Sequence, residues 1–227
     1  MKGITLPTRL IEMFENDHAV GWGVKDNQSR FLYVNNTLKN WQTLSTAVDY
    51  EGRHIREMPV PVAEFADLFS QQEREIERTG QAVRAITTHI QGKEKIMQPA
   101  YSVQEPLYDD AHNCIGTIIS VRHVRIITPS ALLGGEIIQH ATFQSPSSVF
   151  TEKEWEVVYL LVCGMNIKEI SSILTLSTDA VNGRLRSCYR KTSLNSLSAL
   201  IGYCRESKFD HYIPPFFLKK GHIIIRG

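Results

Sequence analysis

Residues 150–193 read FTEKEWEVVYLLVCGMNIKEISSILTLSTDAVNGRLRSCYRKTS, and this stretch decides the fold of the carboxyl-terminal part of the chain. Thr151, followed three residues later by Glu154, is typical of a capping box at the start of a helix that runs to Cys163. A second helix begins at Asn166 or Lys168. The tight turn 175–177 leads into a third helix, and 196–204 form a fourth. The spacing therefore predicts four short helices.

The third of these helices has two unlike faces. Val181, Leu185 and Cys188 recur at the i, i+4, i+7 spacing of an inward face. The outward positions are polar and basic. Two helices joined by a tight turn, the second basic on its exposed face, are the pattern of a helix-turn-helix that binds DNA. The outward residues are Asn182, Gly183, Arg186 and Arg190.

About 55 residues of this region resemble the LuxR/NarL-type DNA-binding domain in order and spacing. Residues 150–158 are similar to the family opening LTxREREVL, 168–171 to KEIA, 177–181 to SxxTV and 189–191 to YxK. The resemblance implies a four-helix domain whose third helix enters the major groove of double-stranded DNA. It assigns base contacts to Asn182, Gly183 and Arg186, and further DNA or capping contacts to Arg184, Arg190, Lys191, Lys168, Ser177 and Thr178.

The amino-terminal half predicts a different fold. A helix over 6–15 is followed by two strand-like runs around the polar turn 26–29, and Gly80 ends a helix over 62–79. Three more strand-like runs follow at 82–91, 97–107 and 114–124. This order predicts a five-stranded antiparallel sheet with helices on one side, so the whole chain is expected to be α+β.

Residues 15–125 resemble a PAS domain. Val24-Lys25-Asp26, followed by residues 30–35, is similar to the PAS entry hairpin. A receiver domain is less consistent with the sequence, because Asp109-Asp110 falls in a hairpin turn rather than at a strand end. An acyl-homoserine-lactone-binding domain is also less consistent, because it does not account for the entry hairpin. The resemblance implies a cavity that holds haem, flavin or a small metabolite, or an empty domain that serves dimerisation.

Aromatic residues supply the candidate pocket in this half. Trp22, Tyr33 and Trp41 are the residues expected to line it, although aromatic residues near a small core more often serve packing. The conceivable haem ligands are His18, His54 and His89. Flavin photochemistry is disfavoured because residues 1–113 contain no cysteine, and the four cysteines lack zinc-finger spacing. The sequence therefore assigns no metal site and leaves the cofactor unknown.

Composition changes between the two halves. Residues 127–149 are rich in Gly, Pro and Ser and predict a linker, with a short helix around 136–141. The expected domains are thus 1–126 and 150–227. The apolar runs 212–218 and 223–225 are expected to pack on a domain or a partner.

Charge supports this division. The 227 residues carry a net charge of +1, but residues 151–227 hold 11 basic and 7 acidic residues, while 1–150 are acidic overall. A basic second half is consistent with a polyanionic partner. No apolar run approaches the roughly 20 residues of a membrane helix, and the amino terminus lacks the apolar core of a secretory signal.

These observations predict a cytoplasmic transcription regulator that binds double-stranded DNA as a homodimer. Its PAS-like domain is expected to sense a small molecule or partner, and no membrane association is expected. No catalytic motif is present, so an enzyme is not expected. The alternative is a protein-interaction adaptor with little DNA binding, motivated by departures from the family pattern at Ala180, Asn182 and Gly183.

Overall fold

The computed structural model describes residues 6–42, 49–124 and 141–225. Its contacts divide the chain into two compact units: Met1–Val124 together with Lys219–Gly227, and Arg125–Leu218. Among the helices of the described residues, none is long and apolar enough to cross a membrane.

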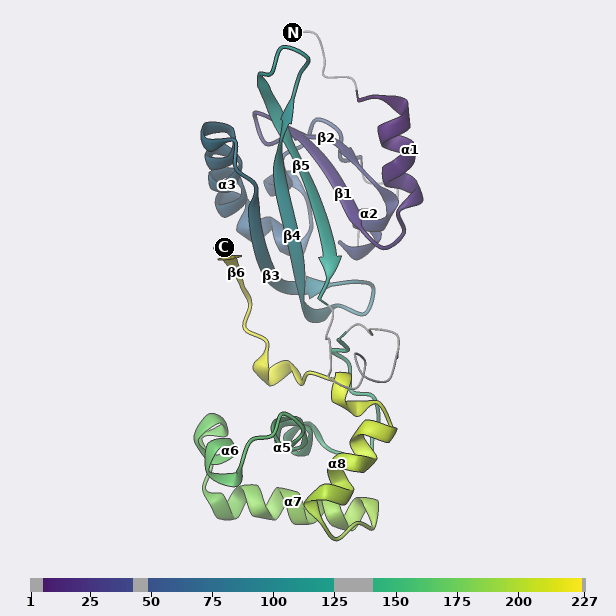
Figure 1. Ribbon diagram of the computed structural model, residues 1–227, viewed down its shortest axis with the longest axis vertical. Coiled ribbons are helices and arrows are strands. Elements are labelled where there is room, and N and C mark those ends of the chain that lie inside the picture. The colour runs from purple at the N-terminus through teal and green to yellow at the C-terminus, as the bar shows by residue number, and fades with distance from the viewer. Residues whose placement is uncertain (1–5, 43–48, 125–140, 226–227) are drawn as a thin grey trace. The chain divides into compact units, whose positions relative to one another are not determined.

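The first unit is built on one six-stranded sheet (Figure 1). Its strand order is β2-β1-β5-β4-β3-β6, and all neighbouring strands are antiparallel. The five expected strands form close to their predicted bounds. The sixth strand was not predicted. The strands are β1 (Gly21–Asp26), β2 (Phe31–Val34), β3 (Val83–Gln91), β4 (Ile96–Tyr108), β5 (Cys114–His123) and β6 (Gly221–Ile225).

Helices cover both faces of this sheet. The helix expected over 62–79 starts as the 3-10 turn η2 (Pro61–Phe65) and continues as α3 (Ala66–Thr79), which Gly80 ends with a φ of +66°. The helix α2 (Asn36–Trp41) packs on β1, and the short turn η1 (Ile55–Glu57) precedes η2.

The first helix corrects the expectation of helices on one side only. Phe14 of α1 (Thr8–Asn16) stacks on Trp22 at 4.6 Å, and on Tyr33. Trp22 lies three residues from Lys25 in β1 and therefore points to the opposite face of the sheet. That face is covered by α1 because burying these rings removes a large apolar area from water.

Asn35 fixes the start of α2 and the end of β2. Its Oδ1 accepts hydrogen bonds from the backbone N–H of Trp22 and of Leu38, and its Nδ2 donates to the carbonyls of Phe14 and Val20, all at 2.9–3.0 Å. The side chain is fully buried. A buried polar group with all its partners joins α1, β1 and α2 in one arrangement.

The second unit contains the four predicted helices: α5 (Glu152–Val162), α6 (Ile167–Leu174), α7 (Thr178–Thr192) and α8 (Leu197–Glu206). Trp155 is the centre of its core, with edge-to-face contacts to Phe150, Phe209 and Tyr212 at 4.8–5.3 Å. Phe209 and Tyr212 follow α8 in a segment that contains the 3-10 turns η3 (Phe209–His211) and η4 (Pro215–Phe217). The first apolar run of the tail thus packs within its own unit.

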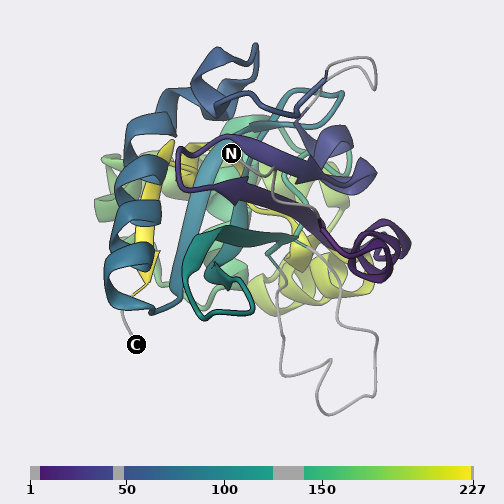
Figure 2. The same cartoon turned by 90° about the horizontal axis from the view of Figure 1, so that it is seen from above.

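The second apolar run of the tail lies elsewhere. Residues 221–225 form β6 and pair with β3, so this part of the expected 150–227 domain belongs to the sheet of the first unit. Figure 2 shows β6 in yellow beside α3. In the second unit, Thr142 of the expected linker pairs with Tyr212. The short helix expected at 136–141 falls almost entirely outside the described residues.

Candidate DNA-binding helix and ligand cavity

The helix-turn-helix is set by local capping. Thr151 and Glu154 form the predicted capping box of α5, and Asn166 caps α6 in the same reciprocal way with Glu169. Thr175 then takes a φ of +53°, which ends α6, and the Ser177 hydroxyl accepts a hydrogen bond from the Ala180 N–H at 3.1 Å. Each cap contributes on the order of 1 kcal/mol, so the turn between α6 and α7 is encoded locally.

The orientation of α7 agrees with the sequence prediction. Val181, Leu185 and Cys188 are buried in the core of the second unit. Of the nine predicted DNA-contacting residues, Arg186, Arg190, Lys191, Lys168, Ser177 and Thr178 are exposed, whereas Asn182, Gly183 and Arg184 are partly exposed.

Gly183 lies on a helix surface without a packing reason. A Cβ atom added there would meet nothing within 4 Å. Glycine in a helix interior costs roughly 0.5–1 kcal/mol relative to alanine, so a glycine that no neighbour requires is unfavourable for folding alone.

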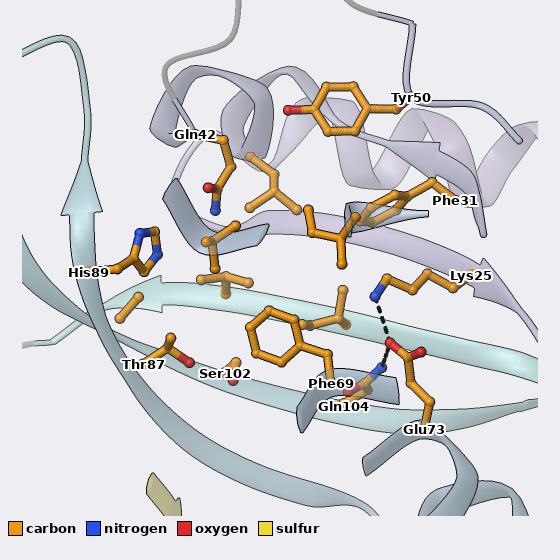
Figure 3. A pocket seen from close by; sticks show the side chains of 16 residues that line it. Lys25, Phe31, Gln42, Tyr50, Phe69, Glu73, Thr87, His89, Ser102 and Gln104 are labelled. Atoms are coloured by element: carbon orange, nitrogen blue, oxygen red, sulfur yellow. Dashed lines mark hydrogen bonds and ion pairs between the residues drawn. The ribbon is translucent and has the colours of Figure 1, made fainter. Parts of the chain in front are cut away.

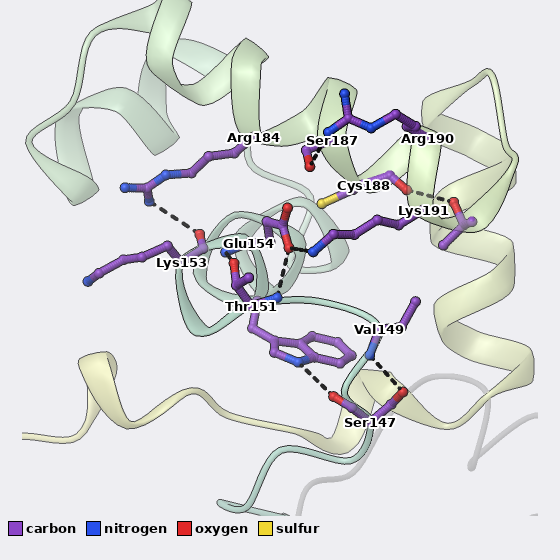
Figure 4. A network of polar contacts seen from close by, with 12 residues as sticks. Ser147, Val149, Thr151, Lys153, Glu154, Arg184, Ser187, Cys188, Arg190 and Lys191 are labelled. Carbon is purple, nitrogen blue, oxygen red and sulfur yellow. Dashed lines mark hydrogen bonds and ion pairs between the residues drawn. The ribbon is translucent and has the colours of Figure 1, made fainter.

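Two of the predicted contacts hold α7 on α5 instead of being free (Figure 4). Arg184 donates to the Lys153 carbonyl at 3.2 Å and lies 3.5 Å from the Glu156 carboxylate. The Lys191 Nζ lies 2.5 Å from Glu154 Oε2. Burial acts to raise the pKa of Glu154, but hydrogen bonds from Lys191 and Thr151 outweigh it and lower that pKa to about 2.

The other basic residues of this surface are less constrained. Arg190 donates to the Ser187 hydroxyl at 3.2 Å. Among the described residues, Arg186 and Lys168 have no side-chain hydrogen bond or ion pair. Their charges are therefore open to an external anion.

The first unit contains a cavity of about 70 Å³ between the sheet and the helices α2 and α3 (Figure 3). A single water needs only about 10–15 Å³, so this cavity has room for several heavy atoms. Its apolar wall includes Phe31, Leu38, Ile55, Val62, Phe69, Ile119 and Val121.

An ion pair forms one end of the cavity. Lys25 Nζ lies 2.6 Å from Glu73 Oε1, and Gln104 donates to the same oxygen at 3.1 Å. Both charged side chains are buried. Burial acts to raise the pKa of Glu73, but Lys25 outweighs it and holds that pKa below its ordinary value. This end of the cavity is polar with no net charge.

The other end carries neutral polar groups. Thr87, His89, Ser102 and Gln42 line it, and Tyr50 faces the same space. His89 is buried, with Nδ1 2.9 Å from the Ile90 carbonyl, and burial lowers its pKa. The cavity thus combines an apolar wall with polar groups at both ends, as binding sites for small molecules do.

The expected pocket residues Trp22, Tyr33 and Trp41 do not line this cavity. Trp22 stacks on Phe14 and donates its indole N–H to Asp17 at 3.1 Å. The Tyr33 hydroxyl donates to Glu15 at 2.7 Å, and the Trp41 ring lies 4.1 Å from that of His123. This is a correction: these aromatic residues pack on other elements because their strand and helix positions point away from the cavity.

The three histidines considered as haem ligands are also separated. His89 lines the cavity, His18 is exposed, and His54 Nε2 lies 3.1 Å from the Ser70 hydroxyl. Sequence reasoning missed Lys25 and Glu73. The signal was a lysine directly after the apolar run 20–24 and in the same strand, where a buried lysine is unfavourable unless an acid pairs with it.

Family comparisons agree with this geometry. Residues 148–204 match the model of bacterial regulatory proteins of the luxR family, and residues 17–126 match a model of the PAS fold. No curated protein matches the chain in sequence.

Solved structures match over nearly the whole length. The chain is 25% identical to a Vibrio cholera VqmA–ligand–DNA complex, with a TM-score of 0.73 and 98% of each chain covered. It is 27% identical to a Vibrio cholerae VqmA dimer without target DNA, with a TM-score of 0.50 and 96% of each chain covered. It is 25% identical to VqmA bound to DPO, with a TM-score of 0.51, covering 97% of this chain and 98% of that chain.

The two family matches coincide with the two structures described above. The PAS match spans strands β1 to β5, and the luxR match spans α5 to α7 and most of α8. The chain is therefore a DNA-binding transcription regulator with a PAS domain and a LuxR-type helix-turn-helix.

Proposed function

We propose that a small neutral molecule binds the PAS cavity of this protein and controls the binding of DNA by its helix-turn-helix. The Lys25–Glu73 pair carries this proposal, because it supplies hydrogen-bonding groups inside an apolar wall while its two charges cancel. A charged ligand would leave one buried charge without a partner, which is strongly unfavourable. The favoured ligand thus has an apolar body and polar groups at both ends.

Related structures support a choice of first compound. In the similar structures, VqmA is bound to DPO in one and to a ligand and DNA in another. We therefore expect DPO to bind the full-length protein in isothermal titration calorimetry. Ser102→Leu fills the cavity and is expected to abolish binding, whereas Ser120→Leu places the same side chain on the other face of the sheet and serves as control.

We assign DNA recognition to α7. Asn182 and Arg186 are placed at base edges, where Asn pairs with adenine and Arg with guanine, and Gly183 is placed where the helix backbone approaches the groove. Arg190, Lys168, Ser177 and Thr178 are assigned to phosphates. Arg184 and Lys191 would reach DNA only by sharing their carboxylate partners, so we give them a supporting role.

We further propose that the protein acts as a cytoplasmic homodimer. One recognition helix contacts too few base pairs for useful specificity, and paired half-sites about one helical turn apart suit two copies. The VqmA dimer structure supports this assembly. We place the PAS domain in residues 1–126 and the linker in 127–149. The DNA-binding domain follows from 150.

Fluorescence anisotropy with an operator duplex and a scrambled duplex tests DNA recognition. Arg186→Ala is expected to lower discrimination between the duplexes by about 1–3 kcal/mol. Arg205→Ala removes an exposed arginine of α8 and is the control. The affinity for DNA is expected to fall steeply as the salt concentration rises, because phosphate contacts release counterions. Failure to bind any duplex at low salt would favour the adaptor alternative.

A further inference from the structure

On the carboxyl-terminal strand β6, the one side chain that is not classed as exposed is that of His222. It forms five backbone pairs with β3, from Thr88 opposite Gly221 to Arg84 opposite Ile225. Its isoleucines bury little surface, and Ile223 is 66% exposed. A short edge strand with so little apolar burial is only weakly stable by itself. Beyond its backbone pairing with β3, β6 is therefore docked through the contacts of His222.

His222 contacts two residues of the cavity wall. Its Nδ1 lies 2.9 Å from the Thr87 hydroxyl, and its ring meets the Phe69 ring edge-to-face at 5.3 Å. Thr87 and Phe69 both line the cavity, and Thr87 points into it from β3 (Figure 3). His222 thus lies directly behind the surface that a ligand would touch.

An ion pair lies immediately before the first residue of β6. Lys220 Nζ lies 2.5 Å from Glu64 Oε2, with both side chains well exposed to solvent. Exposed ion pairs contribute little to stability, so this contact adds little to the docking of β6. A change in the cavity would therefore reach β6 mainly through the contacts of His222.

We propose that β6 is a positioning element of the cavity, and that a ligand in the cavity and the docked carboxyl-terminal strand stabilise each other through His222. The proposal rests on the small-molecule function proposed above and extends it to regulation. A ligand that fixes Phe69 and Thr87 fixes the partners of His222. Because such coupling is reciprocal, the factor by which docked β6 raises ligand affinity equals the factor by which the ligand raises the equilibrium constant for docking of β6.

The chain order gives this coupling a consequence. Unit two ends at Leu218, and β6 follows immediately from Lys219 onward. A docked β6 ties the residues after Leu218 to the sheet of the first unit, and a released β6 removes that tie. Ligand occupancy therefore sets how tightly these residues are tied to the sheet.

Hydrogen–deuterium exchange on the full-length protein tests the coupling. DPO is expected to slow exchange of the β6 amides in the wild type. His222→Ala is expected to weaken DPO binding by about fivefold, the effect of losing one hydrogen bond, and to abolish the DPO-dependent protection of β6. Ile223→Ala, on the same strand but facing away from the cavity, is the matched control and should behave as wild type.

A conservative variant separates positioning from general stability. His222→Asn keeps an amide near the position of Nδ1 and is expected to restore most of the affinity and the protection. DPO binding with unchanged β6 exchange, or equal affinities for His222→Ala and Ile223→Ala, would overturn the inference while leaving the proposed function intact.

A ligand-free measurement decides the case in which DPO does not bind the wild type. Thr87→Val removes the partner of His222 from the cavity side and should speed exchange of β6. Thr88→Val, at the next position of β3 and on the other face of the sheet, should not. If the wild type does not bind DPO but β6 exchanges faster in Thr87→Val than in Thr88→Val, DPO is overturned as the ligand and the positioning role of His222 is supported. Equal exchange in the two variants would overturn that role.

Discussion

The Nζ atom of Lys191 on α7 and the Oε2 atom of Glu154 on α5 lie 2.5 Å apart. The same carboxylate oxygen accepts a hydrogen bond from the Thr151 N–H at 2.7 Å. Glu154 therefore closes the cap of α5 and anchors α7 with one buried carboxylate. A basic residue of α7 thus contributes to the packing of the second unit itself.

Replacing Lys191 by methionine should destabilise the protein. Glu154 would keep its charge in a buried position with one partner fewer, which costs about 1–3 kcal/mol of unfolding free energy. Urea denaturation followed by circular dichroism measures this loss. Arg190→Met is the matched control, because Arg190 is exposed and should change the same free energy by less than about 0.5 kcal/mol. Equal losses in both variants would contradict the anchoring role.

Gly183→Ala should separate folding from DNA binding. The added Cβ meets no atom within 4 Å, so the helix gains roughly 0.5–1 kcal/mol of stability. Affinity for the operator should fall if the backbone approaches DNA at this position. Gly202→Ala in α8, where a Cβ also meets nothing, should give a similar gain in stability with unchanged affinity. Thermal denaturation measures the stability and anisotropy measures the affinity. An unchanged affinity of Gly183→Ala would contradict a close approach of DNA to the helix backbone at residue 183.

Stability of the first unit should fall in mild acid. Burial lowers the pKa of both His89 and His222 below the ordinary value of 6.5. The unfolded chain then takes up protons first, so the stability is full above pH 6.5 and declines as the pH falls below it, by up to about 1.4 kcal/mol per pH unit for each histidine. Urea denaturation at pH 7.5 and pH 5.5 measures the change. His89→Gln should flatten the dependence, and the exposed His18→Gln should leave it as it is.

Breaking the buried ion pair should be more harmful than removing it. Lys25→Met leaves the Glu73 charge buried without its cation and is expected to cost about 3–5 kcal/mol. The double variant Lys25→Met/Glu73→Leu removes both charges and should recover most of that loss. Recovery is read from unfolding free energies. A double variant no more stable than Lys25→Met would mean that Glu73 is not penalised by the loss of Lys25.

Local signals in the sequence predicted the helix-turn-helix closely. The caps at Thr151 and Ser177 and the inward spacing of Val181, Leu185 and Cys188 all involve residues within one or two turns of each other. The same holds for Gly80, whose left-handed conformation ends α3. Such features need no knowledge of distant contacts.

Distant pairings were beyond the sequence. Lys25 and Glu73 lie 48 residues apart, and Thr87 and His222 lie 135 apart. The run of isoleucines in β6 has no alternation that would identify a half-buried strand. Trp22 was placed in the pocket because composition does not reveal which face of a strand a residue occupies, and a shift of one residue reverses that face.

The position of β6 at the end of the sheet has a practical consequence for anyone handling this protein. A recombinant version stopped before residue 219 would expose the backbone groups of β3 along the edge that β6 now covers. An uncovered strand edge invites pairing with other chains and hence aggregation. The isoleucines exposed on β6 also favour association of its outer edge with other chains. Because added charge near this strand opposes that association, a charged tag fused after residue 227 should improve solubility more than one fused at the amino terminus.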